Sequence, residues 1–368
     1  MSLEQRLSRA WQRQAWWLWL LLPLTGLYAL ADGVHRWLYH WGLKKIDYPP
    51  VPLIVIGNIT AGGSGKTPLL IALVKYLQTR GVRVGVISRG HGGAGARHPQ
   101  LVRVDSMPKE VGDEPCLIVQ STGVPMAVGA KRGAAVDWLL QHYPDTQLIL
   151  ADDGLQHYAL DRDAEWIVVD AERGLGNRQR LPAGFLRQPI KRLFAPNATV
   201  IWHCRDWQQP PMADTRQRLA QAGQRTDLFM RLKVQPLMAL FADHMTAQTL
   251  RPQNSPQVVA MTGIGYPSRF FASVERLGFG VVPFAFDDHH AFTLADFMPV
   301  QKADLASLPI VITTKDAVKI RPLLANATNA AAQALRARLW VLPVEAELSP
   351  AVFATLNQQL IKFNIFKS

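Results

Sequence analysis

Cysteine is scarce in this sequence, which has only two, Cys116 and Cys204, among 368 residues. Two cysteines this far apart cannot build a disulfide framework, and they are too few for a structural zinc site. We therefore expect both to be core residues of a protein in a reducing compartment. The sequence also shows no internal repeat and no low-complexity tract, so nothing in it indicates a repeat architecture.

Acidic residues are also in short supply, with 28 Asp and Glu against 40 Lys and Arg, a net charge of +12 and a pI near 9.9. Such a balance favours an anionic partner, which can be nucleic acid, a phosphorylated small molecule or an anionic membrane. No basic stripe with aromatic residues forms a nucleic-acid module, so we expect no nucleic-acid partner. The length and the 48% hydrophobic content indicate about two domains with sizeable cores.

Charge is absent from an N-terminal run of eighteen residues, 14–31, that reads QAWWLWLLLPLTGLYALA. A cleaved signal peptide would have a shorter apolar core and a small-residue cleavage site. A transmembrane helix needs about 20 apolar residues, so the run is marginal for one, and a buried soluble helix fits poorly with the flanking arginines. Three tryptophans instead suit the headgroup level: Trp16, Trp17 and Trp19. We therefore predict a membrane anchor, followed at 37–45 by an interfacial helix that touches anionic membrane lipids.

A glycine-rich loop, GNITAGGSGKTP at 57–68, lies between an apolar run at 51–56 and a helical pattern at 69–81. This order of strand, loop and helix predicts a phosphate-binding P-loop, although Thr60 stands where the strict pattern has glycine. An ordinary glycine-rich turn is the alternative. Lys66 would reach the β- and γ-phosphates, and the Thr67 hydroxyl would bind Mg²⁺. The nucleotide-binding residues we predict are Thr60, Ala61, Gly62, Gly63, Ser64, Gly65, Lys66 and Thr67.

An acid pair, Asp152-Asp153, follows a second hydrophobic strand at 147–151. In P-loop proteins a strand of this kind carries a carboxylate to the metal beside the phosphates. A turn capped by aspartate is the alternative. We predict that Thr67 and the pair, with Glu114, hold Mg²⁺, and we take His157 as a further candidate because it follows on the same loop.

Other polar residues stand at the ends of predicted strands or the starts of helices. Asp113-Glu114 opens a helix, where acids ordinarily serve as caps. The functional interpretation makes Asp113 a general base for a hydroxyl nucleophile. Arg89 follows a strand at 82–87 and Arg132 follows one at 124–128. Either arginine could bind a negatively charged phosphate. Arg132 could equally lie on a solvent-exposed face of a helix.

The C-terminal part reads as a second α/β unit. A strand at 281–286 ends in Asp287-Asp288-His289-His290, a plausible catalytic or metal cluster. A strand at 310–313 leads to Lys315 and Asp316, which can grip a purine base or cap a helix. The pattern predicts an α/β fold: a P-loop NTPase-type core with a mostly parallel sheet, a second, smaller α/β domain and an N-terminal membrane-anchoring helix. The divisions we expect are 1–48 as anchor and interfacial helix, 49–206 as P-loop domain, 207–256 as linker region and 257–368 as second domain.

Taken together, the motifs resemble one family. They are GNITAGGSGKTP, SRGHGG, GDEP, DDGLQH, LPAGFLR, TGIG, FDDHH and TTKDAVK, in this order up to about Lys319. The set resembles tetraacyldisaccharide 4′-kinase, the lipid A 4′-kinase of Gram-negative bacteria. Two positions depart from its pattern, since His91 stands where the family often has tyrosine and Gln188 where many members have an acid. Neither belongs to the P-loop, so they bear on substrate contacts rather than on the class.

The resemblance implies an ATP-dependent kinase that uses Mg²⁺. Its acceptor would be the 4′-hydroxyl of an acylated glucosamine disaccharide 1-phosphate, at the cytoplasmic face of the inner membrane. Asp113 would take the hydroxyl proton, and His289 would orient Asp113 across the two domains. No protein partner is inferred. A P-loop GTPase or metallochaperone-type switch at the membrane is the alternative, which Lys315-Asp316 fits and the tryptophan-rich anchor does not. A nucleic-acid-binding ATPase rests on the pI alone, and a non-enzymatic scaffold leaves the P-loop unexplained.

Overall fold

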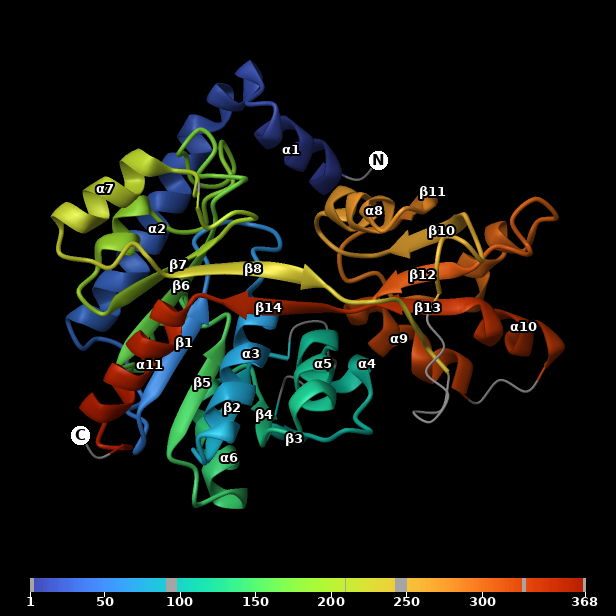
Figure 1. Ribbon diagram of the computed structural model, residues 1–368. Coiled ribbons are helices and arrows are strands. Elements are labelled where there is room, and N and C mark those ends of the chain that lie inside the picture. Colours follow the sequence, from blue (N-terminus) through green and yellow to red (C-terminus); the bar gives the residue numbers. More distant parts are fainter. Residues whose placement is uncertain (1–2, 91–97, 209, 242–249, 326–328, 367–368) are drawn as a thin grey trace.

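The computed structural model describes residues 3–90, 98–208, 210–241, 250–325 and 329–366 (Figure 1). The described strands form two sheets. The larger has the order β14-β8-β7-β6-β1-β5-β2-β4-β3. Its strands are β1 (Leu53–Gly57), β2 (Val84–Ser88), β3 (Gln100–Val102), β4 (Met126–Val128), β5 (Leu148–Asp152), β6 (Ala164–Asp170), β7 (Ala198–His203), β8 (Phe229–Val234) and β14 (Val344–Leu348).

The larger sheet is parallel except at its two edges, where β3 pairs with β4 and β14 pairs with β8 in antiparallel fashion. Its central strands β1, β5 and β6 are buried throughout and mostly apolar, because helices cover both faces. Successive residues of β1 pack into different cores, with Ile54 in one and Val55 in the other. The helices of this unit are α3 (Lys66–Thr79), α4 (Pro108–Val111), α5 (Asp113–Thr122), α6 (Arg132–His142), α7 (Ala213–Gln221) and α11 (Pro350–Lys362).

The smaller sheet has the order β11-β10-β12-β13-β9 and is parallel except for β9. Its strands are β9 (Met238–Ala239), β10 (Gln257–Thr262), β11 (Gly280–Ala285), β12 (Ile310–Thr313) and β13 (Leu339–Leu342). Its helices are α8 (Pro267–Arg276), α9 (Thr314–Ala325) and α10 (Ala330–Arg338). Short 3₁₀ helices complete the described chain: η3 (Ile190–Phe194), η5 (Leu294–Phe297) and η6 (Pro299–Gln301).

The chain passes from one sheet to the other along β8 to β9 and returns along β13 to β14 (Figure 1). The expected division at 207–256 and 257–368 is therefore wrong in two respects. The supposed linker contains β8, a strand of the larger sheet, and β14 with α11 also belongs to that sheet although both lie in the supposed second domain. The reason is long-range pairing: β8 and β14 are joined antiparallel, with Met230 opposite Leu348.

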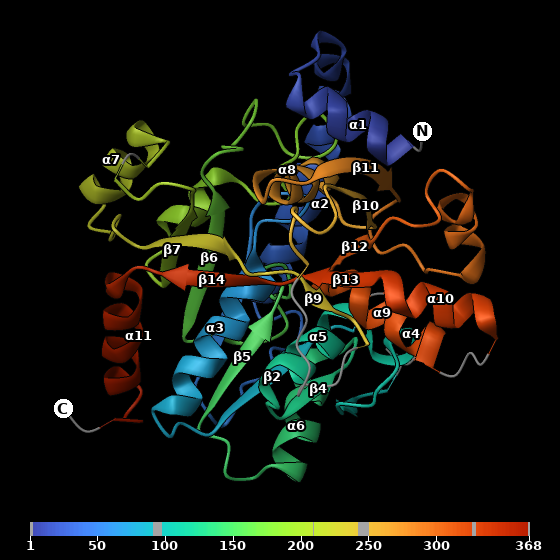
Figure 2. The ribbon, with the colours of Figure 1, turned by 45° about the vertical axis from the view of Figure 1, so that its right-hand side comes forward.

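Three helical segments open the chain: α1 (Leu3–Gln12), η1 (Trp16–Leu21) and α2 (Leu22–His40). The stretch Trp16–His40 is long and apolar enough to cross a membrane, and only 11% of its most apolar window is buried. The separate interfacial helix expected at 37–45 is not present, because α2 continues to His40 and turns follow it. In both ribbon views α1 extends from the apolar segment of η1 and α2 toward α8 of the smaller unit (Figures 1 and 2).

Candidate active site

The predicted P-loop joins the end of β1 to the start of α3, which confirms the order of strand, loop and helix. Gly65 ends the loop with a φ of +94°, where an added Cβ would lie 2.6 Å from Met230 Cε and 3.2 Å from His203 Nδ1. Only glycine fits this left-handed and crowded position without strain. The first backbone N–H groups of α3 are thereby left free to face phosphate oxygens.

Asn58, which the sequence analysis did not single out, holds the loop from inside. It is buried, and its Nδ2 donates to the carbonyl oxygens of Thr60 at 2.8 Å and Gly62 at 3.3 Å. Its Oδ1 accepts a hydrogen bond of 3.1 Å from Lys66 Nζ. One amide therefore fixes both the loop backbone and its lysine. A lone asparagine after a strand carries no spacing signal that could have revealed this.

Two further side chains support the loop from neighbouring strands. Arg173 Nη1 donates to the carbonyl oxygen of Ala61 at 2.6 Å. His203, at the end of β7, lies with Nδ1 2.9 Å from the carbonyl oxygen of Ser64. Burial lowers the pKa of His203, so its ring is neutral and donates from Nδ1. The phosphate-binding loop is thus fixed at both ends by the sheet that carries it.

The pairing of β5 beside β1 brings the predicted acid pair next to the P-loop. Asp153 Oδ1 lies 2.6 Å from Lys66 Nζ, and its Oδ2 lies 3.3 Å from Arg187 Nη1. Burial raises the pKa of Asp153, but the charges of Lys66 and Arg187 outweigh it and hold the pKa below its usual value. Asp153 is therefore an ionised partner of the P-loop lysine.

Asp152 has a different environment. It is fully buried, and among the described residues its Oδ1 has no hydrogen-bond partner. Burial and the nearby Glu114 raise its pKa to about 7, against the opposing charge of Lys66. An orphaned buried carboxylate oxygen beside a second acid is stabilised by a divalent cation.

The donor set suits Mg²⁺ better than a cation that needs a complete protein cage. The described residues contain no group of three or more His, Cys, Asp or Glu that could hold a metal ion alone. Mg²⁺ is usually bound through one or two carboxylates together with substrate phosphates and water. Asp152 and the half-buried Thr67 at the start of α3 meet that description, whereas Glu114 and Asp153 are already paired with lysine.

Asp113 and His289 meet across the two sheets. Asp113 begins α5 of the larger unit, and His289 follows β11 of the smaller one. His289 Nδ1 lies 3.1 Å from Asp113 Oδ2 and 3.2 Å from Oδ1. The next histidine faces elsewhere: His290 Nε2 is 3.1 Å from Asp296 Oδ2. Of the pair, His289 is therefore the histidine that belongs to the site.

The two partners of this pair differ in basicity. Burial raises the pKa of Asp113, but the hydrogen bond from His289 and the charge of Lys315 outweigh it and bring the pKa to about 2. The bond to Asp113 raises the pKa of His289 above its ordinary value, against burial and the charge of Lys315. The carboxylate is therefore a weak base, and the imidazole is the group that changes protonation near neutral pH.

A phosphate loop, an acid pair and an acid–histidine pair thus lie in one region. The family model for tetraacyldisaccharide-1-P 4′-kinase matches residues 17–361. The chain belongs to this kinase family. As a member of that family it is a kinase, and the alternative of a GTPase-type switch is not favoured.

Relatives named tetraacyldisaccharide 4′-kinase match the kinase along nearly its whole length. The protein of Psychrobacter cryohalolentis is 48% identical over 376 residues, covering 99% of this chain and 98% of the relative. That of Chromobacterium violaceum is 44% identical over 346 residues, covering 94% of each. The crystal structure of LpxK from Aquifex aeolicus, in complex with ATP, superposes with a TM-score of 0.67 at 22% identity, over 94% of this chain and 99% of that one. The kinase shares that fold.

Asp316 does not face the open site. It is fully buried, and its Oδ2 accepts hydrogen bonds of 2.7 Å from the hydroxyls of both Thr262 and Thr313. Its Oδ1 lies 3.0 Å from Lys319 Nζ. These contacts fix the turn between β10 and α8, and Lys315 is paired with Glu114. The idea that Lys315 and Asp316 grip a purine base is therefore not supported by this geometry.

The remaining predicted residues flank the acid pair. Arg132 is buried, with Nη2 3.0 Å from the carbonyl oxygen of Asp153. Burial and the charge of Arg132 lower the pKa of His157 to about 4, so this ring is neutral. Arg89 is exposed after β2. His91, where the family pattern differs, lies outside the described residues.

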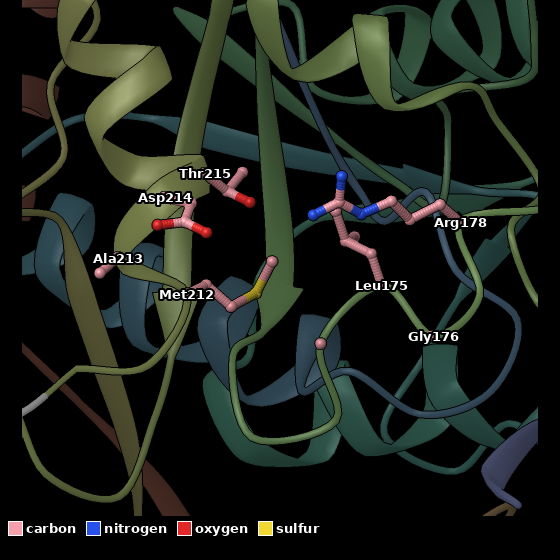
Figure 3. A pocket seen from close by; sticks show the side chains of 8 residues that line it. Leu175, Gly176, Arg178, Met212, Ala213, Asp214 and Thr215 are labelled. Carbon is pink, nitrogen blue, oxygen red and sulfur yellow. The ribbon is translucent and has the colours of Figure 1, made fainter. Parts of the chain in front are cut away.

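Two cavities lie beside the segment 174–190, and one of them also borders α2. One, of about 410 Å³, separates the loop around Arg178 from Met212 and the start of α7 (Figure 3). The other, of about 480 Å³, lies between α2 and the segment 178–190, and Arg178 lines both. Neither is lined by the P-loop, the acid pair or Asp113 and His289. Gln188, the second departure from the family pattern, is fully buried and donates to Tyr158 Oη at 2.9 Å.

Proposed function

We propose that this kinase transfers the γ-phosphoryl group of ATP to the 4′-hydroxyl of a tetraacylated glucosamine disaccharide 1-phosphate, a step of lipid A biosynthesis. The names of the relatives support this acceptor. The observation that carries the proposal is the Asp113–His289 pair, with Nδ1 3.1 Å from Oδ2, at the interface that also carries the P-loop. A hydroxyl acceptor needs a proton acceptor beside the transferred phosphoryl group, and a simple nucleotide switch does not.

The nucleotide is held by the P-loop backbone and by Lys66. Lys66 is paired with Asp153 in this structure. When ATP binds, the lysine gives up part of this contact and binds the negatively charged β- and γ-phosphates instead. Asp152 and Thr67 would hold Mg²⁺, which supplies charge neutralisation at the phosphates when bound. Arg187 and Arg132 add positive charge on the same side.

The proton is taken by His289 rather than by Asp113, which reverses the roles suggested by the sequence. Asp113, with a pKa of about 2, accepts the Nδ1–H bond and keeps the ring oriented. The 4′-hydroxyl gives its proton to Nε2 while its oxygen forms the new bond to the γ-phosphorus. The bond from that phosphorus to the bridging oxygen breaks, and its electron pair leaves on ADP. Asp113 and Asp288 then flank an imidazolium and stabilise it.

The kinase works at the cytoplasmic face of the inner membrane, where a lipid acceptor and soluble ATP can meet. The exposed side chains of Trp16, Leu20, Leu27 and Leu30 form an apolar surface along η1 and α2. Leu27→Glu with Leu30→Glu should lower the fraction that sediments with phosphatidylethanolamine and phosphatidylglycerol vesicles. Val104→Glu, at an equally exposed apolar residue outside the anchor, should leave it unchanged. Equal sedimentation of all variants would contradict this placement.

The test of the proposed chemistry is the His289→Ala variant in a labelled transfer assay with detergent-dispersed acceptor. Loss of a general base should lower kcat by roughly 10² to 10⁴, while ATP binding stays within twofold of the wild type. His290→Ala, next in the chain but bonded to Asp296, is the matched control and should keep most of the turnover. Wild-type turnover in His289→Ala would show that His289 is not the general base.

A further inference from the structure

Lys315 occupies the centre of the interface between the two sheets. It lies in the first turn of α9, and its side chain is only 17% exposed. Its Nζ reaches the other unit, 3.1 Å from Glu114 Oε1 and 3.8 Å from Asp113 Oδ2. Within its own unit the same nitrogen is 3.6 Å from Asp288 Oδ1. These acidic neighbours outweigh burial and raise the pKa of Lys315, so the ammonium is charged at every working pH.

The fourth contact of this ammonium determines which ring nitrogen of His289 carries the proton. Lys315 Nζ lies 3.4 Å from His289 Nε2. An ammonium has only donors, so Nε2 must be the acceptor and its lone pair must be free. The ring proton then resides on Nδ1, which donates to Asp113 at 3.1 Å. Lys315 and Asp113 together therefore select one tautomer and fix the plane of the ring.

We propose that Lys315 is a positioning residue of the phosphoryl transfer, which keeps His289 Nε2 unprotonated and aimed at the acceptor hydroxyl while tying the ring to Glu114 of the larger unit. This inference rests on the proposed function. The 3.4 Å contact is long for a hydrogen bond between nitrogens, so the acceptor hydroxyl can replace it. Lys315 stays in place during that exchange because Glu114 and Asp288 hold it.

A purely structural cross-link predicts something different. The ion pair of Arg269 with Asp170 also joins the two units, with Nη2 2.7 Å from Oδ2, and contains no catalytic group. If Lys315 only joined the units, its loss would resemble the loss of Arg269. If it positions His289, its loss must lower kcat in folded protein saturated with ATP, and an added primary ammonium ion must restore part of that turnover.

The experiment compares Lys315→Ala, Lys315→Gln and Lys315→Arg with the wild type in the labelled transfer assay. Lys302→Ala, at an exposed lysine of the same unit, is the matched control. We expect kcat to fall by about 10-fold to 100-fold in the alanine and glutamine variants, with the KM for ATP within twofold. Added ethylammonium should restore part of the turnover of Lys315→Ala and none of that of His289→Ala. Tetramethylammonium, which has no N–H, should restore nothing.

Each outcome decides the inference. Turnover of Lys315→Ala within threefold of the wild type would overturn it, as would equal rescue by the two ammonium ions. If the alanine variant does not fold, the shorter, uncharged Lys315→Gln makes the same comparison. Failure of the wild type to label the acceptor would instead overturn the proposed function. Normal wild-type labelling with an active Lys315→Ala would overturn only the role of Lys315.

Discussion

Arg269 of α8 and Asp170 at the end of β6 form an ion pair across the two sheets, with Nη2 2.7 Å from Oδ2. Asp170 is only 4% exposed, and its Oδ1 accepts the backbone N–H of Arg173 at 3.1 Å. A buried carboxylate of the larger unit thus takes its charged partner from the smaller one. The pair holds the units in the arrangement that joins Asp113 to His289.

Replacing Arg269 by alanine should therefore weaken both stability and turnover. It leaves a buried carboxylate without its charged partner, which costs about 1–3 kcal/mol in the free energy of unfolding. Urea unfolding and the labelled transfer assay check the two effects. Arg276→Ala, on the same helix but exposed, is the control. If the two variants behaved alike, the pair would not hold the units together.

The pH dependence of kcat/KM should report His289. As a base the ring must be neutral, and the bond to Asp113 raises its pKa above the ordinary histidine value. Activity should therefore fall as the pH drops through this raised pKa. Asp113→Asn removes the carboxylate charge and leaves burial and the charge of Lys315, which lower the pKa of His289, opposed by the charge of Asp288, so the acid limb should move to lower pH. An unmoved limb in Asp113→Asn would assign it to another group.

Asp152 should determine the Mg²⁺ concentration that the kinase needs for phosphoryl transfer. Among the described residues its Oδ1 has no hydrogen-bond partner, and burial with the nearby Glu114 raises its pKa to about 7 against the charges of Lys66 and Arg132. Asp152→Asn should raise the Mg²⁺ concentration for half-maximal transfer by on the order of 10-fold or more, and chelation should abolish transfer in the wild type. The exposed Asp137→Asn is the control. A wild-type Mg²⁺ profile in Asp152→Asn would exclude this carboxylate from the metal site.

Gly65 should tolerate no side chain. Alanine there meets Met230 Cε at 2.6 Å at a φ of +94°, and the left-handed backbone alone costs roughly 1–2 kcal/mol. We expect Gly65→Ala to lose ATP affinity and unfolding free energy. Gly63→Ala is the matched change, since an added Cβ there meets no described atom within 4 Å. Calorimetric ATP binding and urea unfolding compare the two, and equal behaviour would contradict the role of Gly65.

Much of the fold could be predicted because its central strands are apolar runs that end in characteristic motifs. The runs at 51–56 and 147–151 are β1 and β5, within two residues at each end. The pairing of β8 with β14 could not be predicted, because the strands are more than a hundred residues apart and neither local sequence indicates its partner.

The proximity of Lys66 to the acid pair was predictable, because both follow strands that lie side by side in a parallel sheet. The site was not predictable where a lone residue acts through tertiary contact, since Asn58 and Arg269 have no neighbouring pattern. The roles within the Asp113–His289 pair depend on burial and on Lys315, neither of which the local sequence shows.

The most direct test of the account is transfer of label from γ-³²P ATP to tetraacyl disaccharide 1-phosphate in detergent with Mg²⁺, with Lys66→Ala as the blank. The account predicts labelled lipid that carries its new phosphate on the 4′-oxygen, that is absent with Lys66→Ala, and that forms far faster from ATP than from GTP. The account would be contradicted if the lipid stayed unlabelled while the same preparation hydrolysed GTP.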